Sequence, residues 1–146
     1  MKLLIAILVL SLNVFAHEGG HGSLTEGGKF GGVTSPVVNR KQEGQGDKAT
    51  TLYKAELVRT ESGKLSLYIF NSKMELMDLT GFSEEVVAKL EVKKKGKFTY
   101  FGDFKLKKSG NHYSGDLPKV EYKPFNIDFF FGKEKTELFS GFSNLD

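Results

Sequence analysis

The sequence predicts an all-β domain built from antiparallel strands, and three observations lead to this fold class. Apolar and polar residues alternate in seven short runs after about residue 50, which is the pattern of strands with one buried face. Turn-forming residues separate the runs at spacings typical of an antiparallel sandwich or barrel. Aromatic residues make up 12% of the chain, with 13 Phe, 5 Tyr and no Trp, and Phe and Tyr favour strands.

The seven predicted strands follow one another along the second two thirds of the chain. The first two form a hairpin around a turn at 61–64, and the third and fourth are joined by a lysine-rich turn at 93–97. The runs are 53–57, 65–70, 86–92, 98–106, 112–117, 125–131 and about 136–142. Their alternation places Leu57, Leu67, Leu90, Phe104, Ile127 and Phe129 in the core.

Residues 1–16 have the layout of a cleavable signal peptide. Lys2 supplies a positive charge, an apolar run follows from Leu3 to Leu12, and Ala16 is the small residue expected before a cleavage site. The apolar run is about half the roughly 20 residues that a membrane-spanning helix needs. We therefore expect a chain that begins at His17 and is periplasmic or secreted. Because the sequence has no cysteine, we expect neither a lipid anchor nor disulfides.

Residues 17–48 differ in composition from the rest of the chain. Glycine is frequent and large apolar residues are few, so this segment is predicted to be a flexible Gly-rich arm before a β domain at 49–146. Residues 30–39 are the part of the arm expected to dock on the domain as an irregular edge. Pro36 argues against a central strand there, because proline cannot donate to a sheet ladder.

Several segments in their order resemble a known group of proteins. They are the His/Gly opening His17–Gly22, the strands 53–58 and 67–71, and the segment 125–129. This order is similar to that of small exported immunoglobulin-like β-sandwich proteins of Gram-negative bacteria. The His/Gly opening resembles that of periplasmic subunits of heavy-metal efflux systems. The resemblance implies an immunoglobulin-like β-sandwich of about seven strands and a periplasmic location.

The histidines suggest a metal site. After cleavage, His17 offers an α-amine and an imidazole, His21 adds a second imidazole across Gly19-Gly20, and His112 completes the set if the arm folds back. Such nitrogen ligands suit copper, with zinc or nickel as alternatives. The same residues match the protease motif H-E-x-x-H, but two central glycines disfavour the helix that this motif requires. The first hypothesis is thus a non-catalytic protein that binds metal weakly or assists metal homeostasis.

The second hypothesis is an envelope interaction protein. Seven lysines gather in and after the predicted turn between the third and fourth strands, at 93, 94, 95, 97, 105, 107 and 108. They indicate either a solvated edge or a surface for an acidic protein partner or an anionic polymer. Phe129, Phe130 and Phe131 form the most apolar run, and Phe130 breaks the alternation, so it points outward or into a second layer.

Other function classes are disfavoured by the sequence. The net charge of +3 is too small to predict nucleic-acid binding by itself, because such binding requires a strong, clustered basic surface. His112, Ser114 and Asp116 lie on one face of a predicted strand, but residues two apart there are about 7 Å from each other, too far for a catalytic triad. No phosphate-binding loop or dinucleotide motif is present. We therefore expect no enzymatic activity.

Overall fold

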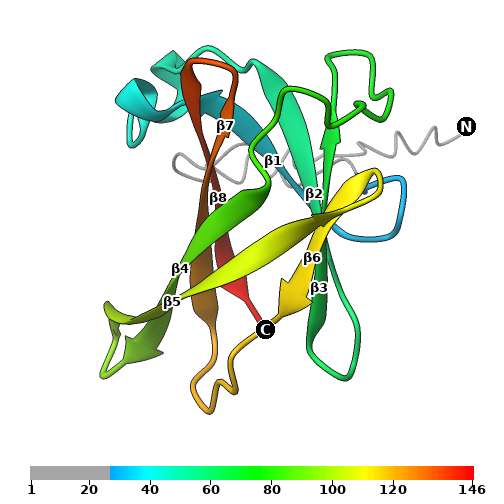
Figure 1. Ribbon diagram of the computed structural model, residues 1–146. Coiled ribbons are helices and arrows are strands. Elements are labelled where there is room, and N and C mark those ends of the chain that lie inside the picture. Colours follow the sequence, from blue (N-terminus) through cyan, green and yellow to red (C-terminus); the bar gives the residue numbers. More distant parts are fainter. Residues whose placement is uncertain (1–26) are drawn as a thin grey trace, which may run out of the picture.

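Eight antiparallel strands close into a single barrel in the computed structural model, which describes residues 27–146 (Figure 1). The strand order around the barrel is β1-β2-β3-β6-β5-β4-β7-β8, and β8 returns to pair with β1. The strands are β1 Val33–Asn39, β2 Tyr53–Arg59, β3 Lys64–Phe70, β4 Glu85–Lys94, β5 Lys97–Ser109, β6 His112–Asp116, β7 Phe125–Lys133 and β8 Thr136–Leu145. Two short 3-10 turns, η1 Arg40–Gln42 and η2 Gly46–Lys48, lie between β1 and β2.

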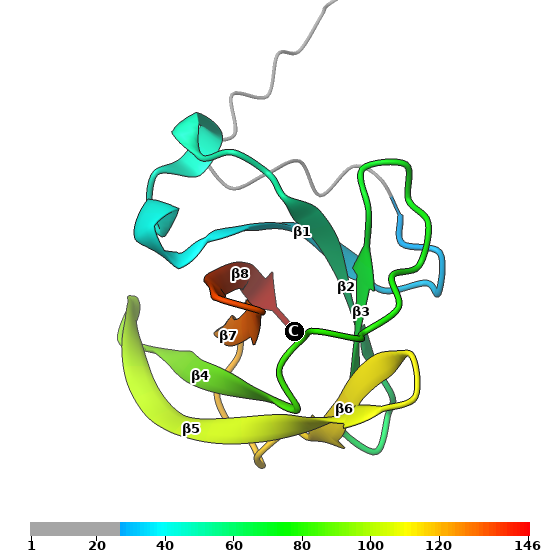
Figure 2. The ribbon, with the colours of Figure 1, turned by 45° about the horizontal axis from the view of Figure 1, so that its top comes forward.

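The all-β prediction is confirmed, but the sandwich of about seven strands is wrong. All seven predicted strands exist, as β2 to β8, and an eighth strand joins them into a closed barrel (Figure 2). Alternation reports only which face of a strand is buried, and the inner faces of a sandwich and of a small barrel alternate in the same way. The closing pairs, β3 with β6 and β1 with β8, connect strands far apart in sequence and leave no local signal.

The strand that was not predicted, β1, corrects the prediction for the arm. Residues 33–39 form β1, which pairs with β2 from Val33 to Val37 and with β8 at Val38 and Asn39. Pro36 has no N–H to donate to a neighbouring strand. On the side of β1 that faces β8, two hydroxyl groups join the strands. Ser140 Oγ donates to Pro36 O at 3.0 Å, and Ser35 Oγ donates to Gly141 O at 2.6 Å. The predicted signal peptide 1–16 and residues 17–26 of the arm lie outside the described residues.

Side chains fill the barrel. Leu57, Leu67, Leu90, Ile127 and Phe129 are buried as predicted, and Phe104 packs partly buried against them. Tyr113 is the largest fully buried side chain, and its hydroxyl donates to Ser83 O at 2.7 Å. The strands thus surround a packed core, and exposed chemistry is confined to the outer face, the strand edges and the ends.

Burial of Tyr113 predicts a loss of stability at alkaline pH. Removal from water raises the pKa of its phenol to about 12, whereas an exposed tyrosine has a pKa of about 10. Folding therefore favours the neutral phenol, so its contribution to stability is complete below about pH 10 and is lost between about pH 10 and pH 12. Denaturant unfolding across this range should show the decline, and Tyr113→Phe should make it shallower. An equally steep decline in Tyr113→Phe would contradict the assignment.

Candidate binding surface

The β4–β5 hairpin carries the most distinctive exposed chemistry of the described residues. Its turn is Lys95-Gly96, and both residues have positive φ, as two-residue hairpin turns of type I′ require. β4 and β5 are long, at 10 and 13 residues, and pairing between β4 and β7 stops at Val92. The hairpin therefore extends past the end of β7. Its turn lies at the lower left of the barrel in Figure 1.

Four lysines surround this turn and define the lysine tip: Lys93, Lys94, Lys95 and Lys97. All four are exposed, and no acidic side chain among residues 27–146 forms an ion pair with them. Lys93 lies 5.9 Å from the ring centre of Phe98, and Lys94 lies 4.7 Å from that of Tyr122. The positive charge of the tip is therefore available to an outside partner.

The other lysines of the predicted cluster differ from the lysine tip in their contacts. Lys105 Nζ forms a 2.8 Å ion pair with Glu85, which lowers the pKa of that carboxyl group through hydrogen bonding and charge. Lys108 Nζ contacts Glu84 at 2.9 Å and Phe82 O at 3.0 Å. Lys107 is exposed. The predicted cluster thus divides into the lysine tip and a set that includes two lysines engaged with the chain itself.

Exposed aromatic rings accompany the lysine tip, and sequence reasoning did not identify them as a surface. Phe98, Tyr100 and Phe101 on β5 are 36%, 57% and 42% exposed, and Tyr122 is 44% exposed. Phe101 lies where the register between β4 and β5 shifts, since Glu91 pairs with Tyr100 and Leu90 with Gly102. The only sequence signal for an exposed aromatic surface was the combination of Phe, Tyr and Gly residues in 98–102. The same combination also fits an ordinary buried strand.

The predicted aromatic strand at 129–131 does not form a free surface. Phe129 and Phe131 are buried in the core, whereas Phe130 points to the outer face. There Phe130 packs on Phe139 with ring centres 5.5 Å apart, and the guanidinium of Arg40 lies 4.9 Å from its ring centre. Neighbouring side chains therefore partly cover this ring.

Of the three predicted metal ligands, His112 is the one that lies within the described residues. His112 stacks on Tyr68 with ring centres 4.9 Å apart, and its Nδ1 lies 3.1 Å from Asn111 Oδ1. His17 and His21 lie outside the described residues. Among residues 27–146, no three His, Cys, Asp or Glu side chains are grouped so as to hold a metal ion. The metal site stays a prediction.

A buried carboxylate ties a glycine-rich loop to the outside of β2. Glu56 is fully buried, and its Oε1 accepts hydrogen bonds from Phe30 N and Gly32 N, both at 2.8 Å. Its Oε2 is buried without a hydrogen-bond partner among the described residues. Phe30 stacks on Tyr68 at 4.2 Å, so a row of three rings, Phe30, Tyr68 and His112, crosses this face. The loop is thus held by both polar and aromatic contacts.

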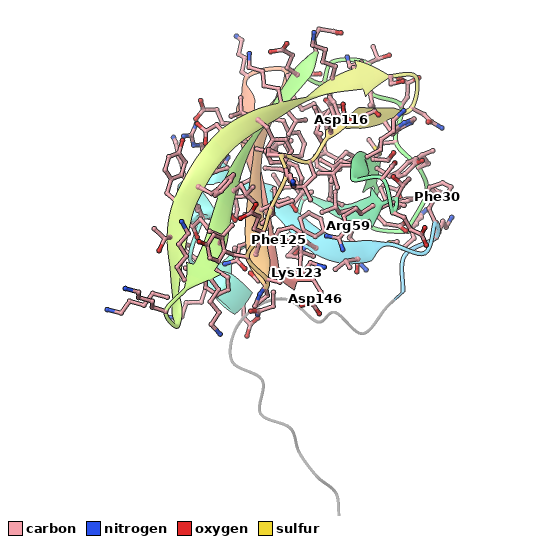
Figure 3. All side chains as sticks on the ribbon, turned by 90° about the horizontal axis from the view of Figure 1, so that it is seen from below. Phe30, Arg59, Asp116, Lys123, Phe125 and Asp146 are labelled. Carbon is pink, nitrogen blue, oxygen red and sulfur yellow. The ribbon has the colours of Figure 1, made fainter. Side chains whose placement is uncertain are left out.

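A small cavity of about 230 Å³ opens at the lower end of the barrel, between the ends of β1, β2, β7 and β8. Arg59, Phe125 and Asp146 gather at this mouth, with Lys123 beside them and Phe30 apart from them (Figure 3). The Arg59 guanidinium lies over the Phe125 ring and donates to the main-chain oxygen of Asp146. Arg59 is the only lysine or arginine among residues 27–146 that lines this cavity, and the chain itself binds it, so the lysine tip is the stronger candidate.

Among residues 27–146, no helix has the length and apolar character needed to cross a membrane. The chain matches no protein-family model, no curated protein and no solved structure.

Proposed function

We propose that the chain is a non-catalytic binding protein of the cell envelope, and that its β4–β5 hairpin binds an acidic partner. The observation that carries this proposal is the lysine tip, with four exposed lysines that lack an ion-pair partner among the described residues. Aromatic rings beside it supply area that is buried favourably when a partner covers them. Like charges held close together repel each other, and an acidic partner relieves this repulsion.

Binding to polyglutamate tests this proposal. A variant with all four tip lysines changed to glutamine should bind immobilised polyglutamate about tenfold more weakly at moderate salt, and binding by the unchanged protein should fall as salt rises. In a matched control, four exposed lysines in connections at the other end of the barrel are changed to glutamine. They are Lys41, Lys48, Lys73 and Lys135. Those connections lie opposite the β4–β5 turn in Figure 1.

The control should bind within about threefold of the unchanged protein, because it has the same net charge as the tip variant but keeps the tip. Equal losses in the two variants would mean that net charge alone attracts polyglutamate. That result, or an absence of binding by the unchanged protein, would overturn the proposal. Melting curves of both variants establish that the barrel is intact.

A further inference from the structure

The outer edge of β5 is open along most of its length. β5 pairs with β6 only at Lys107, Lys108 and Ser109, whereas it pairs with β4 from Lys97 to Lys107, apart from Phe101 at the register shift. Between Lys97 and Phe104, therefore, no second strand of the described residues lies beside β5, and we call this stretch the open edge. Residues 97–101 are all exposed, which agrees with a strand uncovered on that side.

The backbone direction shows which groups the open edge offers. Lys93 donates its N–H to Pro124 O at 3.1 Å, away from β5, so Lys93 and Phe98 do not exchange backbone hydrogen bonds. Hydrogen-bonding direction alternates along an antiparallel strand, so the N–H and C=O of Phe98 point to the open edge, as do those of Tyr100. Lys108 donates its N–H to Glu84 O at 2.9 Å, away from β6, so the backbone groups of Lys107, Lys105 and Asp103 point to the side of β6 and the open edge.

The open edge ends where the chain covers it. A Cβ placed on Gly115 would lie 2.7 Å from Lys105 O, so β6 already approaches β5 closely at that residue. Phe98, Tyr100 and Asp103 thus present backbone donors and acceptors over a stretch long enough for a short added strand. Unpaired edges of this kind pair readily with another extended chain.

We infer that an extended acidic segment of a partner protein adds as a ninth strand along the open edge of β5, an inference that rests on the proposed function. Backbone pairing would supply the geometry, and the lysine tip would attract the acidic side chains. Lys107 continues the positive charge beyond the other end of the edge. At Gly102, a Cβ would meet no atom within 4 Å, which leaves space for a side chain of the added strand.

Charge argues against a second copy of this chain as the occupant. In an antiparallel pair of two open edges, the lysine tip of one copy would lie beside Lys105 and Lys107 of the other. Like charges placed across neighbouring strands are destabilising. Lysine on an edge strand is a known protection against such self-association. An acidic strand reverses the sign of the same interaction.

Two synthetic probes separate strand addition from simple charge attraction. The first is a peptide of about ten residues in which glutamate and valine alternate, long enough to cover the open edge. The second has the same sequence and charge, with N-methyl groups on alternate residues so that one edge cannot donate backbone hydrogen bonds. The unchanged protein should bind the first peptide about tenfold more tightly than the second.

Variants at Tyr100 give the matched comparison within the protein. Tyr100→Pro removes an N–H that points to the open edge, which an edge strand tolerates, and should weaken binding of the first peptide about tenfold. Tyr100→Ala removes the ring and keeps the N–H, so it should keep the preference of about tenfold for the first peptide over the second, even where loss of the ring lowers the affinity for both. Circular dichroism and melting curves of both variants confirm the fold. If Tyr100→Pro unfolds, the comparison is made with the two peptides and the unchanged protein.

The outcomes distinguish this inference from the proposed function. Equal affinity for the two peptides would overturn strand addition and leave an acidic partner held by charge alone. Binding to heparin or to vesicles of acidic lipid, without binding to the first peptide, would also overturn it and would favour a polymer or a membrane as the partner. If no acidic probe binds, both the inference and the proposed function fail.

Discussion

Ile127→Ala should lower the free energy of unfolding by about 2–5 kcal/mol, the cost of deleting a large aliphatic side chain from a packed core. Ile127 is fully buried in the middle of β7, where it pairs with Leu90 of β4 and with Phe142 of β8. All three side chains are buried in the core. The surrounding strands are hydrogen-bonded on both sides and can close the resulting space only in part. Urea unfolding followed by circular dichroism measures the loss.

Val87→Ala is the control for this prediction. Val87 lies on β4, beside β7, but its side chain points to the outer face and is 39% exposed. Its truncation should cost less than about 1 kcal/mol. If the two variants lose the same free energy, the assignment of inner and outer faces on these two strands is wrong.

The sidedness of the strands could be predicted from sequence, but the closure of the barrel could not. Ile127 lies between Asn126 and Asp128, and Phe129 follows it at the same period of two residues, so their burial could be predicted. Phe104 follows the same rule but is only partly buried, because β5 leaves β6 at this point and one flank is uncovered. Pairing between distant strands decides that difference, and alternation carries no information on it.

β1 escaped prediction for a local reason. Its residues are flanked by glycines and interrupted by Pro36, which are signals of a loop or an edge. Hydroxyl groups join β1 to β8 beside the proline, since Ser35 Oγ donates to Gly141 O and the fully buried Ser140 donates to Pro36 O. A serine at 140 reads in sequence as an ordinary polar residue of a strand. Its partner becomes visible only when the barrel closes.

The candidate surface was predicted in part. The run of lysines at 93–97 identified the turn and its charge directly from sequence. Exposure of Phe98, Tyr100 and Phe101 was not predictable, because a strand with these residues would be buried if another strand covered its outer edge. The short overlap of β5 with β6 decides their exposure, and it depends on where the turn at Gly110 and Asn111 reverses the chain.

Glu56→Ala should lower the free energy of unfolding by about 1–3 kcal/mol, because it leaves the N–H groups of Phe30 and Gly32 without their acceptor. Glu56→Gln keeps an oxygen for both donors and should lose less. Gly28→Ala should also destabilise the loop, since the added Cβ would overlap Cδ and Oε1 of Glu56. Urea unfolding and proteolysis of the loop measure these effects.

The double variant gives the decisive comparison. The three atoms nearest to a Cβ at Gly28 all belong to the Glu56 side chain, and all three are absent in Glu56→Ala. Gly28→Ala should therefore cost little in the Glu56→Ala background, although it is destabilising in the unchanged protein. Residues in direct contact show such non-additivity, whereas distant residues do not. Additive losses would mean that the loop does not rest on Glu56, and that Gly28 is required for another reason.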